Sequence, residues 1–450
     1  MNRIEFRAAT SLAAVFSVRL LGLFMIYPVF AAYAGQLSGA TPYLIGEALG
    51  IYGLAQGLLQ IPFGLLSDRF GRKRMIVLGL VLFAVGSAVA ALSDSIAGVI
   101  FGRVLQGAGA VGSVILALVA DLTREESRTK AMATVGITIG ASFMIAVVAG
   151  PLAAKFIGVA GIFWLMVGLA VIGVAITIFV VPDPVRVRHH RDAETVPAMI
   201  GAVLRDPQLL RLDIGVFALH AMLTASFLVV PGLLHDVVKV SPSDQWMIYL
   251  PVLVISVIVM VPAIIVAEKH RRMKGVFVCS VAALAVSQMM YYFGAGNFYA
   301  LLVALTIFFA AFNVMEASLP SLITKVAPAD AKGTAAGLFS SLQFLGIFVG
   351  GLVGGWAHQA GGTAGVFMLT TIIALLWLIA AATMKQPSYL TTRLLPIADE
   401  HADPAALAAK LKQVPGVAEA VVIADENLAY LKVDSRSYDA AMAAAVAGAR

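Results

Sequence analysis

The amino-acid sequence predicts an all-α membrane protein of twelve transmembrane helices, arranged as two six-helix bundles, followed by a small α+β domain. Of the 450 residues, 60% are hydrophobic and only 12% are charged, whereas soluble domains average about 45–50% apolar and about 25% charged residues. The mean hydropathy of +0.94 therefore requires that much of the apolar surface faces lipid. Apolar runs long enough to span a membrane recur along most of the chain, and a polar stretch divides them into two sets of six.

The individual spans follow from the length of these runs, because a bilayer core needs about 20 apolar residues per helix. Glycine, proline and charged residues mark their ends. The predicted spans are residues 10–34, 43–66, 75–93, 96–120, 131–153, 160–181, 209–233, 246–267, 275–294, 297–324, 333–356 and 363–384. The first run follows two arginines, as in a secretion leader, but it is longer than the apolar core of about 7–15 residues typical of a leader. We therefore expect a membrane helix there.

The distribution of basic residues predicts the sidedness of the helices. Twenty Lys and Arg residues lie in the N-terminal segment and the even-numbered connections, whereas the odd-numbered connections hold only Lys155 and Lys239. Basic loops stay in the cytoplasm. We therefore expect a multi-pass protein of the cell inner membrane with both termini in the cytoplasm, and we attribute the net charge of +6 to sidedness rather than to a nucleic-acid partner.

Four regions are expected along the chain. They are a first six-helix bundle at 1–181, a linker at 182–208, a second six-helix bundle at 209–384 and a soluble domain at 385–450. The linker contains the basic run Arg186–Arg191, which fits a solvated connection or a patch that binds lipid or a partner. A weak internal repeat relates the halves, since Gly161–Leu165 recurs as Gly365–Leu369, with glycine at both Gly150 and Gly354. Secondary transporters are commonly built from such repeats.

The soluble domain is expected to be ferredoxin-like, with the order βαββα. Strands are predicted at 393–397, 417–424 and 428–434, where β-branched and aliphatic residues cluster. Asp403 followed by Pro404 is a typical helix start, and Ser437 is the expected cap of a last helix. The loop after the first strand offers His401 but no Cys-x-x-Cys motif, and soft metals prefer thiolates. We expect no metal and no cofactor, and a domain that binds a regulator or a small ligand.

The connection between the second and third spans carries an ordered motif. It reads Gly64-Leu65-Leu66-Ser67-Asp68-Arg69-Phe70-Gly71-Arg72-Lys73. A loop that merely held the bases inside would not require this order of glycine, acid and base. The motif resembles the signature loop of the major facilitator superfamily, at the position where that family carries it. The resemblance implies that the loop controls the conformational switch, with Asp68 and Arg69 pairing against the other half and against Asp121.

Other motifs extend the resemblance toward the drug:proton antiporter branch of this family. Arg103 opens an Arg-x-x-Gln-Gly-x-Gly stretch in the fourth span, and Arg19 opens Arg-Leu-Leu-Gly in the first. The fifth span matches the antiporter motif in part, at Gly136, Gly140, Gly150 and Pro151. Small residues there would allow close helix packing. A tail domain of the expected kind occurs in one group of these transporters. The resemblance implies efflux of small amphipathic or drug-like molecules, driven by protons.

Acidic and imidazole groups inside the spans are candidates for proton coupling. Glu316 is the best, because the bilayer disfavours its ionised form, and His220 is the second. Arg103 and Arg19 are intramembrane charges and are further candidates for a part in proton coupling. For Arg103 the alternative is a purely structural role, in which helix carbonyls hold it. Three further acids, at Glu47, Asp213 and Glu268, lie near span ends, where we expect them to face water.

The substrate is expected between the two halves, near the middle of the membrane. Plausible lining residues, each of which could instead serve packing, are Phe24, Tyr27, Asn313, Gln343 and Phe344.

Two other functions share the sequence features: a symporter or uniporter for a nutrient or metabolite, and a membrane sensor that signals through its soluble domain. The intact Gly150-Pro151 argues against the first, and intramembrane charges are unnecessary for the second. No nucleophile–base pair or phosphate loop suggests an enzyme.

Overall fold

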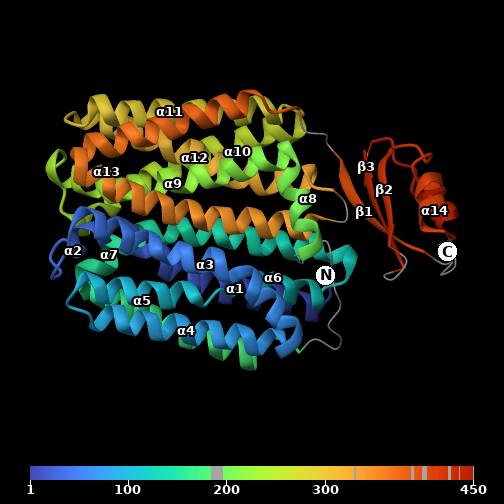
Figure 1. The fold of residues 1–450 in the computed structure, drawn as a ribbon, viewed down its shortest axis with the longest axis horizontal. Helices are drawn as coiled ribbons and strands as arrows, with labels where there is room; N and C mark the ends of the chain where they lie inside the picture. The colour runs from blue at the N-terminus through green and yellow to red at the C-terminus, as the bar shows by residue number, and fades with distance from the viewer. Residues whose placement is uncertain are drawn as a thin grey trace.

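The structure is a computed structural model, and it describes residues 1–183, 196–328, 331–386, 390–397, 403–423, 427–434 and 436–448. A long helical bundle makes up most of the molecule, and a small α/β domain lies beside one end of it (Figure 1). The N-terminus lies at the same end of the bundle as this domain. We call this end the domain end and the other the far end.

The first half of the bundle is built from seven helices. They are α1 (Arg3–Met25), α2 (Tyr27–Ala34), α3 (Pro42–Phe70), α4 (Arg72–Leu92), α5 (Ile96–Ala108), α6 (Gly112–Asp121) and α7 (Glu125–Phe179). The first predicted span is divided between α1 and α2, where Pro28 stands at the start of α2. The fourth is divided between α5 and α6 after Gly109, and α7 contains two spans separated at Gly158, whose φ is 67°.

The second half follows a short connection made of η1 (Pro197–Met199) and α8 (Ile200–Arg205). Its helices are α9 (Pro207–Asp236), α10 (Trp246–Lys269), α11 (Met273–Gly294), α12 (Phe298–Val326) and α13 (Lys332–Ala382), with the turn η2 (Pro242–Asp244) before α10. The long α13 is interrupted at Gly361 and Gly362, so that it also contains two spans. The basic run Arg186–Arg191 lies outside the described residues.

These elements confirm the predicted fold class. Ten helical segments of the described chain are long and apolar enough to cross a membrane. Because α7 and α13 each turn back at a non-helical glycine, these ten provide twelve spans. Their starts follow from local capping: the side chains of Thr41, Ser95, Asp206 and Asn297 accept backbone N–H groups at the starts of α3, α5, α9 and α12.

Equivalent helix pairs pack at glycines in the two halves. A Cβ added at Gly150 of α7 would lie 2.1 Å from the carbonyl oxygen of Met25 in the first span. In the second half, a Cβ at Gly354 of α13, the repeat partner of Gly150, would lie 2.9 Å from Cβ of Ala225 in α9. These distances are shorter than any real Cβ contact, so both pairs require glycine. The weak sequence repeat thus coincides with a repeated packing arrangement.

The soluble domain has the predicted βαββα order. Its elements are β1 (Thr391–Pro396), α14 (Pro404–Leu411), β2 (Val417–Ile423), β3 (Leu428–Val433) and α15 (Ala440–Ala447). β3 lies between β1 and β2 and is antiparallel to both, with Tyr430 opposite Leu394 and Val421. Asp403 caps α14 as predicted, but the cap of α15 is Asp439 rather than Ser437. His401 lies outside the described residues.

This domain contacts the second half at the domain end. The guanidinium of Arg271, between α10 and α11, lies 3.1 Å from Asp434. The backbone N–H of Arg436 and the side chain of Arg271 hold the pKa of Asp434 below its ordinary value. The ammonium of Lys432 donates to the carbonyls of Lys325 and Val326, at 3.2 and 3.3 Å. A cation at the C-terminal end of α12 is favourable because that end carries partial negative charge.

Candidate transport cavity and proton site

A cavity with about 1370 Å³ of empty space lies between the two halves. It reaches the domain end, because Asp68 and Arg72 at the α3–α4 turn line it together with Gly333 and Gly337 at the start of α13. Its walls are mostly aliphatic and aromatic. The larger apolar side chains that line it are Phe16, Leu20, Phe24, Ile61, Leu65, Leu116, Ile139, Phe143, Leu223, Phe312, Phe344 and Ile347.

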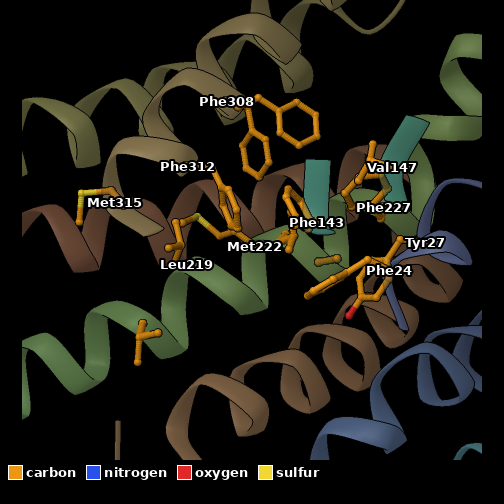
Figure 2. Packing of buried hydrophobic residues seen from close by; sticks show 14 of the residues in the cluster. Phe24, Tyr27, Phe143, Val147, Leu219, Met222, Phe227, Phe308, Phe312 and Met315 are labelled. Carbon is orange, nitrogen blue, oxygen red and sulfur yellow. The ribbon is translucent and has the colours of Figure 1, made fainter. Parts of the chain in front are cut away.

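Aromatic side chains from both halves pack against one another (Figure 2), and Phe24, Phe143 and Phe312 of this group line the cavity. The rings of Phe24 and Phe143 are 5.0 Å apart, and Phe143 lies 5.4 Å from Phe312 of the second half. Beyond them, Tyr27 packs edge-on against Phe227 at 5.5 Å. Tyr27 is fully buried and does not line the cavity. Its expected role as a lining residue is therefore wrong, because its ring takes part in the contact between the halves.

The far end is closed by backbone contact between α3 and α13. A Cβ at Gly46 would lie 2.2 Å from the carbonyl oxygen of Gly351, and one at Gly53 would lie 2.3 Å from that of Phe344. The ammonium of Lys155 also lies 2.8 Å from Asp244 across the two halves. The cavity therefore extends toward one end of the protein while the other end is sealed.

Glu316 and His220, which the sequence offered as separate candidates, meet in the cavity wall. Glu316 of α12 has its Oε2 3.5 Å from Nε2 of His220 on α9. The side-chain amide of Gln343, on α13, approaches His220 Nε2 at 2.8 Å and donates to Glu316 Oε1 at 3.4 Å. The carboxylate is partly exposed to the cavity, with 28% of its side-chain surface accessible, whereas the imidazole is buried.

The hydrogen bonds define which nitrogen of His220 carries a proton. Nδ1 lies 3.1 Å from the carbonyl oxygen of Val216, which can only accept, so Nδ1 donates. In the neutral ring Nε2 then accepts from Gln343. Gln343 thereby links the imidazole to Glu316, to which its amide also donates.

Two of the other expected cavity residues flank this site. Phe344 lines the cavity beside Gln343, and Asn313 lies one helical turn before Glu316, with its amide donating to Ser256 of α10 at 2.6 Å.

The two buried arginines of the first half have different surroundings. Arg103 does not line the cavity. Its Nε and Nη2 donate to the carbonyls of Ala48 and Leu49 at 3.2 Å each, and its Nη1 donates to Gln106. Its expected part in proton coupling is therefore not favoured by its position, since it instead ties α5 to the backbone of α3.

Arg19 does line the cavity, although it is only 1% exposed. Its Nη2 donates to the hydroxyl of Tyr52 and to the side-chain oxygen of Gln56, both on α3. The sequence reasoning missed these partners, although Tyr52, Gln56 and Gln60 recur every fourth residue as a polar stripe on an otherwise apolar helix.

The signature loop forms its ion pairs within the first half. Arg72, rather than Arg69, lies 3.1 Å from Asp121 and also pairs with Asp68. Arg69 is exposed, stacks on Phe70 and has no ion-pair partner among the described residues. The expected pairing of Asp68 and Arg69 with the other half is thus wrong for this structure, where the cavity separates the halves at this end.

Two further residues of this loop have clear local roles. Gly71 adopts a φ of 96°, a conformation that only glycine takes without strain. The ammonium of Lys73 donates to the carbonyl of Val181 at 3.0 Å and pairs with Asp183, so that it holds the end of α7. A Cβ at Gly64 would lie 3.3 Å from Ser113, a tight but not prohibitive approach.

The glycines of the antiporter motif differ from one another. Gly150 packs against the first span, as expected, and Pro151 follows it inside α7. Gly136 and Gly140, however, have no heavy atom within 4 Å of an added Cβ. The expectation that they allow close helix packing is wrong in this conformation, and Gly140 instead borders the cavity.

Of the three acids expected to face water, Glu47 and Glu268 are partly exposed, whereas Asp213 is not. Asp213 on α9 is 1% exposed, and neither carboxylate oxygen has a hydrogen-bond partner among the described residues. The expectation that it faces water is therefore wrong. Glu268 is partly exposed and pairs with Lys325 at 2.5 Å. In the described part of the chain, no group of three His, Cys, Asp or Glu side chains could hold a metal ion.

Comparison with known proteins places these features in context. Residues 12–266 and 212–415 match the profile of the Major Facilitator Superfamily. The chain is 44% identical to the inner membrane transport protein YajR of Escherichia coli (strain K12), over 96% of this chain and 95% of that protein. It is 34% identical to an uncharacterized transporter of Buchnera aphidicola subsp. Acyrthosiphon pisum (strain APS), over 78% of this chain and 90% of the relative.

A solved structure shows the same fold. The crystal structure of the human organic anion transporter MFSD10 (TETRAN) superimposes with a TM-score of 0.60, at 18% identity, over 84% of this chain and all of that chain.

Proposed function

Because this chain belongs to the major facilitator superfamily and is a YajR-type transporter, we propose that it exports small amphipathic molecules across the cell inner membrane in exchange for protons. The proposal places the domain end in the cytoplasm, as the basic loops indicate. The family and the relatives are transporters, so an enzymatic activity is not proposed.

The observation that carries the proposal is the cluster of Glu316, His220 and Gln343 in the wall of the cavity. Within the membrane, a carboxylate that has only neutral partners is costly when it is ionised, unless water reaches it. Proton binding to Glu316 is therefore linked to the hydration of the cavity. With this orientation, the cavity that reaches the domain end would open toward the cytoplasm, where Glu316 would release its proton. In the alternate conformation it would face the outside and take up a proton.

The cavity walls support an amphipathic substrate. Most of the lining surface is apolar, and eleven polar or charged side chains lie among the aromatic and aliphatic ones. Such a surface binds molecules with a large apolar part, and adaptable side chains accept several shapes. Exchange arises if the carrier changes conformation readily only when it holds either the substrate or a proton. The empty, deprotonated carrier then rarely switches between its two conformations.

The test replaces Glu316 by Gln, which mimics the protonated carboxyl group. Purified protein in vesicles with an imposed proton gradient should lose gradient-driven accumulation of substrate but keep exchange of labelled for unlabelled substrate. His220→Ala should have a milder effect, because it removes a neighbour and not the proton acceptor. Full gradient-driven accumulation by Glu316→Gln with an unchanged pH profile would contradict the proposal and make His220 the next candidate.

A further inference from the structure

The cavity wall contains one charged side chain that neither proton exchange nor an ion pair uses among the described residues. Arg19 lies on its wall in the first half, whereas Glu316 lies on its wall in the second. Arg19 has no acidic partner among the described residues, and its two hydrogen-bond acceptors, Tyr52 and Gln56, are neutral. Burying a guanidinium without a counter-charge is unfavourable. A residue that serves only packing would not need this charge.

Arg103 provides an internal comparison, because it lies in the same half and is equally buried. Its Nε, Nη1 and Nη2 all donate to protein oxygens. In Arg19, only Nη2 donates, while Nε and Nη1 have no acceptor among the described residues. A guanidinium has five N–H groups, so three of those on Arg19 remain unused. Arg103 is a structural arginine, whereas Arg19 lines the cavity and has N–H groups that no acceptor among the described residues satisfies.

We infer that Arg19 binds a carboxylate group of the substrate, so that the preferred substrates are amphipathic zwitterions with an apolar body, an acidic group and an amine. This inference rests on the proposed function and names its substrate class. Free guanidinium donors recognise carboxylates by charge-assisted hydrogen bonds. The amine of the same molecule would pair with Glu316 in the opposite wall and compete there with the proton, which is the competition that exchange requires.

The charge balance distinguishes zwitterions from simple ions. Within the cavity, Asp68 and Arg72 pair with each other, which leaves Arg19 and ionised Glu316 as opposite charges on facing walls. A zwitterion satisfies both and adds no net charge. A simple cation leaves Arg19 uncompensated, and a simple anion leaves Glu316 uncompensated. Occlusion in a low-dielectric cavity therefore favours the zwitterion.

Four charge forms of one scaffold test this inference. The probes are 3-(2-naphthyl)alanine, its amide, its N-acetyl acid and its N-acetyl amide, which are a zwitterion, a cation, an anion and a neutral molecule. Their dissociation constants are measured by calorimetry on the full chain in lipid nanodiscs. The zwitterion should bind at least about tenfold more tightly than its amide, the range expected for one charge-assisted hydrogen bond.

Variants assign this preference to Arg19. Arg19→Gln should weaken the binding of both acids by at least about tenfold, and it should leave the dissociation constants of both amides within about twofold of the wild-type values. Arg19→Lys keeps the charge and should retain part of the preference. Tyr52→Phe is the matched control, because it removes an acceptor of Arg19 but not the charge, and it should keep the preference for acids. These variants also separate loss of charge from loss of folding, which is checked by size-exclusion chromatography.

Several results would overturn the inference. Equal affinities of the acids and their amides in the wild type, or no measurable binding of either acid, would contradict it, as would a preference that survives in Arg19→Gln. Its failure is distinct from failure of the proposed function. Glu316→Gln reports on proton exchange, whereas the acid–amide ratio at constant pH reports on Arg19 alone.

Discussion

The seal at the far end of the cavity depends on the absence of a side chain at Gly46. An added Cβ there would lie 2.2 Å from the carbonyl oxygen of Gly351, and 2.7 and 2.9 Å from Cα and N of Gly355. All three neighbours are backbone atoms, which cannot turn away as a flexible side chain would. Gly46→Ala therefore requires α3 and α13 to separate by about 1 Å.

The energetic effect can be estimated from overpacking. An extra methyl group in a tightly packed contact costs about 1–3 kcal/mol, and each 1.4 kcal/mol is tenfold in an equilibrium constant. In alternating access, the contact between α3 and α13 at the far end separates when the cavity opens toward that end. The added methyl group therefore destabilises only the conformation described here. We expect Gly46→Ala to shift the equilibrium toward the conformation open at the far end by about 5- to 150-fold.

Distances between spin labels measure this shift directly. Leu92 at the end of α4 and Tyr299 at the start of α12 lie in different halves at the far end, and they are 71% and 75% exposed. The pair Leu92→Cys and Tyr299→Cys, with Cys279→Ser to remove the native thiol, should gain a population at longer distance in Gly46→Ala.

The matched control is Gly168→Ala on α7, where an added Cβ meets no heavy atom within 4 Å. Both substitutions bring the same gain of about 1 kcal/mol in helix propensity, so only the contact differs. A distance distribution in Gly46→Ala identical to that of the wild type would refute the reasoning. A similar shift in Gly168→Ala would show that the effect does not arise at the contact between α3 and α13.

Two further predictions concern the domain end. Asp68→Asn should abolish or strongly reduce transport while membrane insertion and folding remain intact, because Asp68 pairs with Arg72 in the signature loop. Wild-type transport rates of this variant in vesicles would contradict the prediction. Deleting residues 390–450 should leave measurable flux, because the described contacts of the soluble domain are with the second half and not with the cavity. Complete loss of flux in a stably inserted truncation would instead show that the domain is part of the transport cycle.

The sequence predicted the helices well because each one is determined locally. Apolar length, glycine and proline breaks and capping residues such as Thr41 and Asp206 act within a few residues. The soluble domain followed from the same kind of local signal. The cap of α15 was mistaken because Ser437 and Asp439 are both good caps two residues apart, and only the path of the chain decides between them.

The site was harder to predict, because it depends on which face of each helix meets the cavity. Arg19 and Arg103 look alike in sequence, yet one lines the cavity and the other holds the backbone of α3. Glu316 and His220 were found as separate membrane-embedded groups. Their meeting, and the bridge through Gln343, requires α9, α12 and α13 to be side by side, which no local pattern reports.

The two ends of the bundle are closed by different kinds of contact, and this difference bears on the switch. At the far end, backbone meets backbone along α3 and α13, a contact that is short-ranged and insensitive to charge. At the domain end, the loop between α3 and α4 holds an acid and several bases, and Arg69 remains exposed without an ion-pair partner among the described residues. We propose that closing this end brings Arg69 and Asp68 toward the second half, where ion pairs between these residues and that half would offset the loss of the glycine contacts. Asp68→Asn would remove that compensation, and the carrier would remain open toward the domain end.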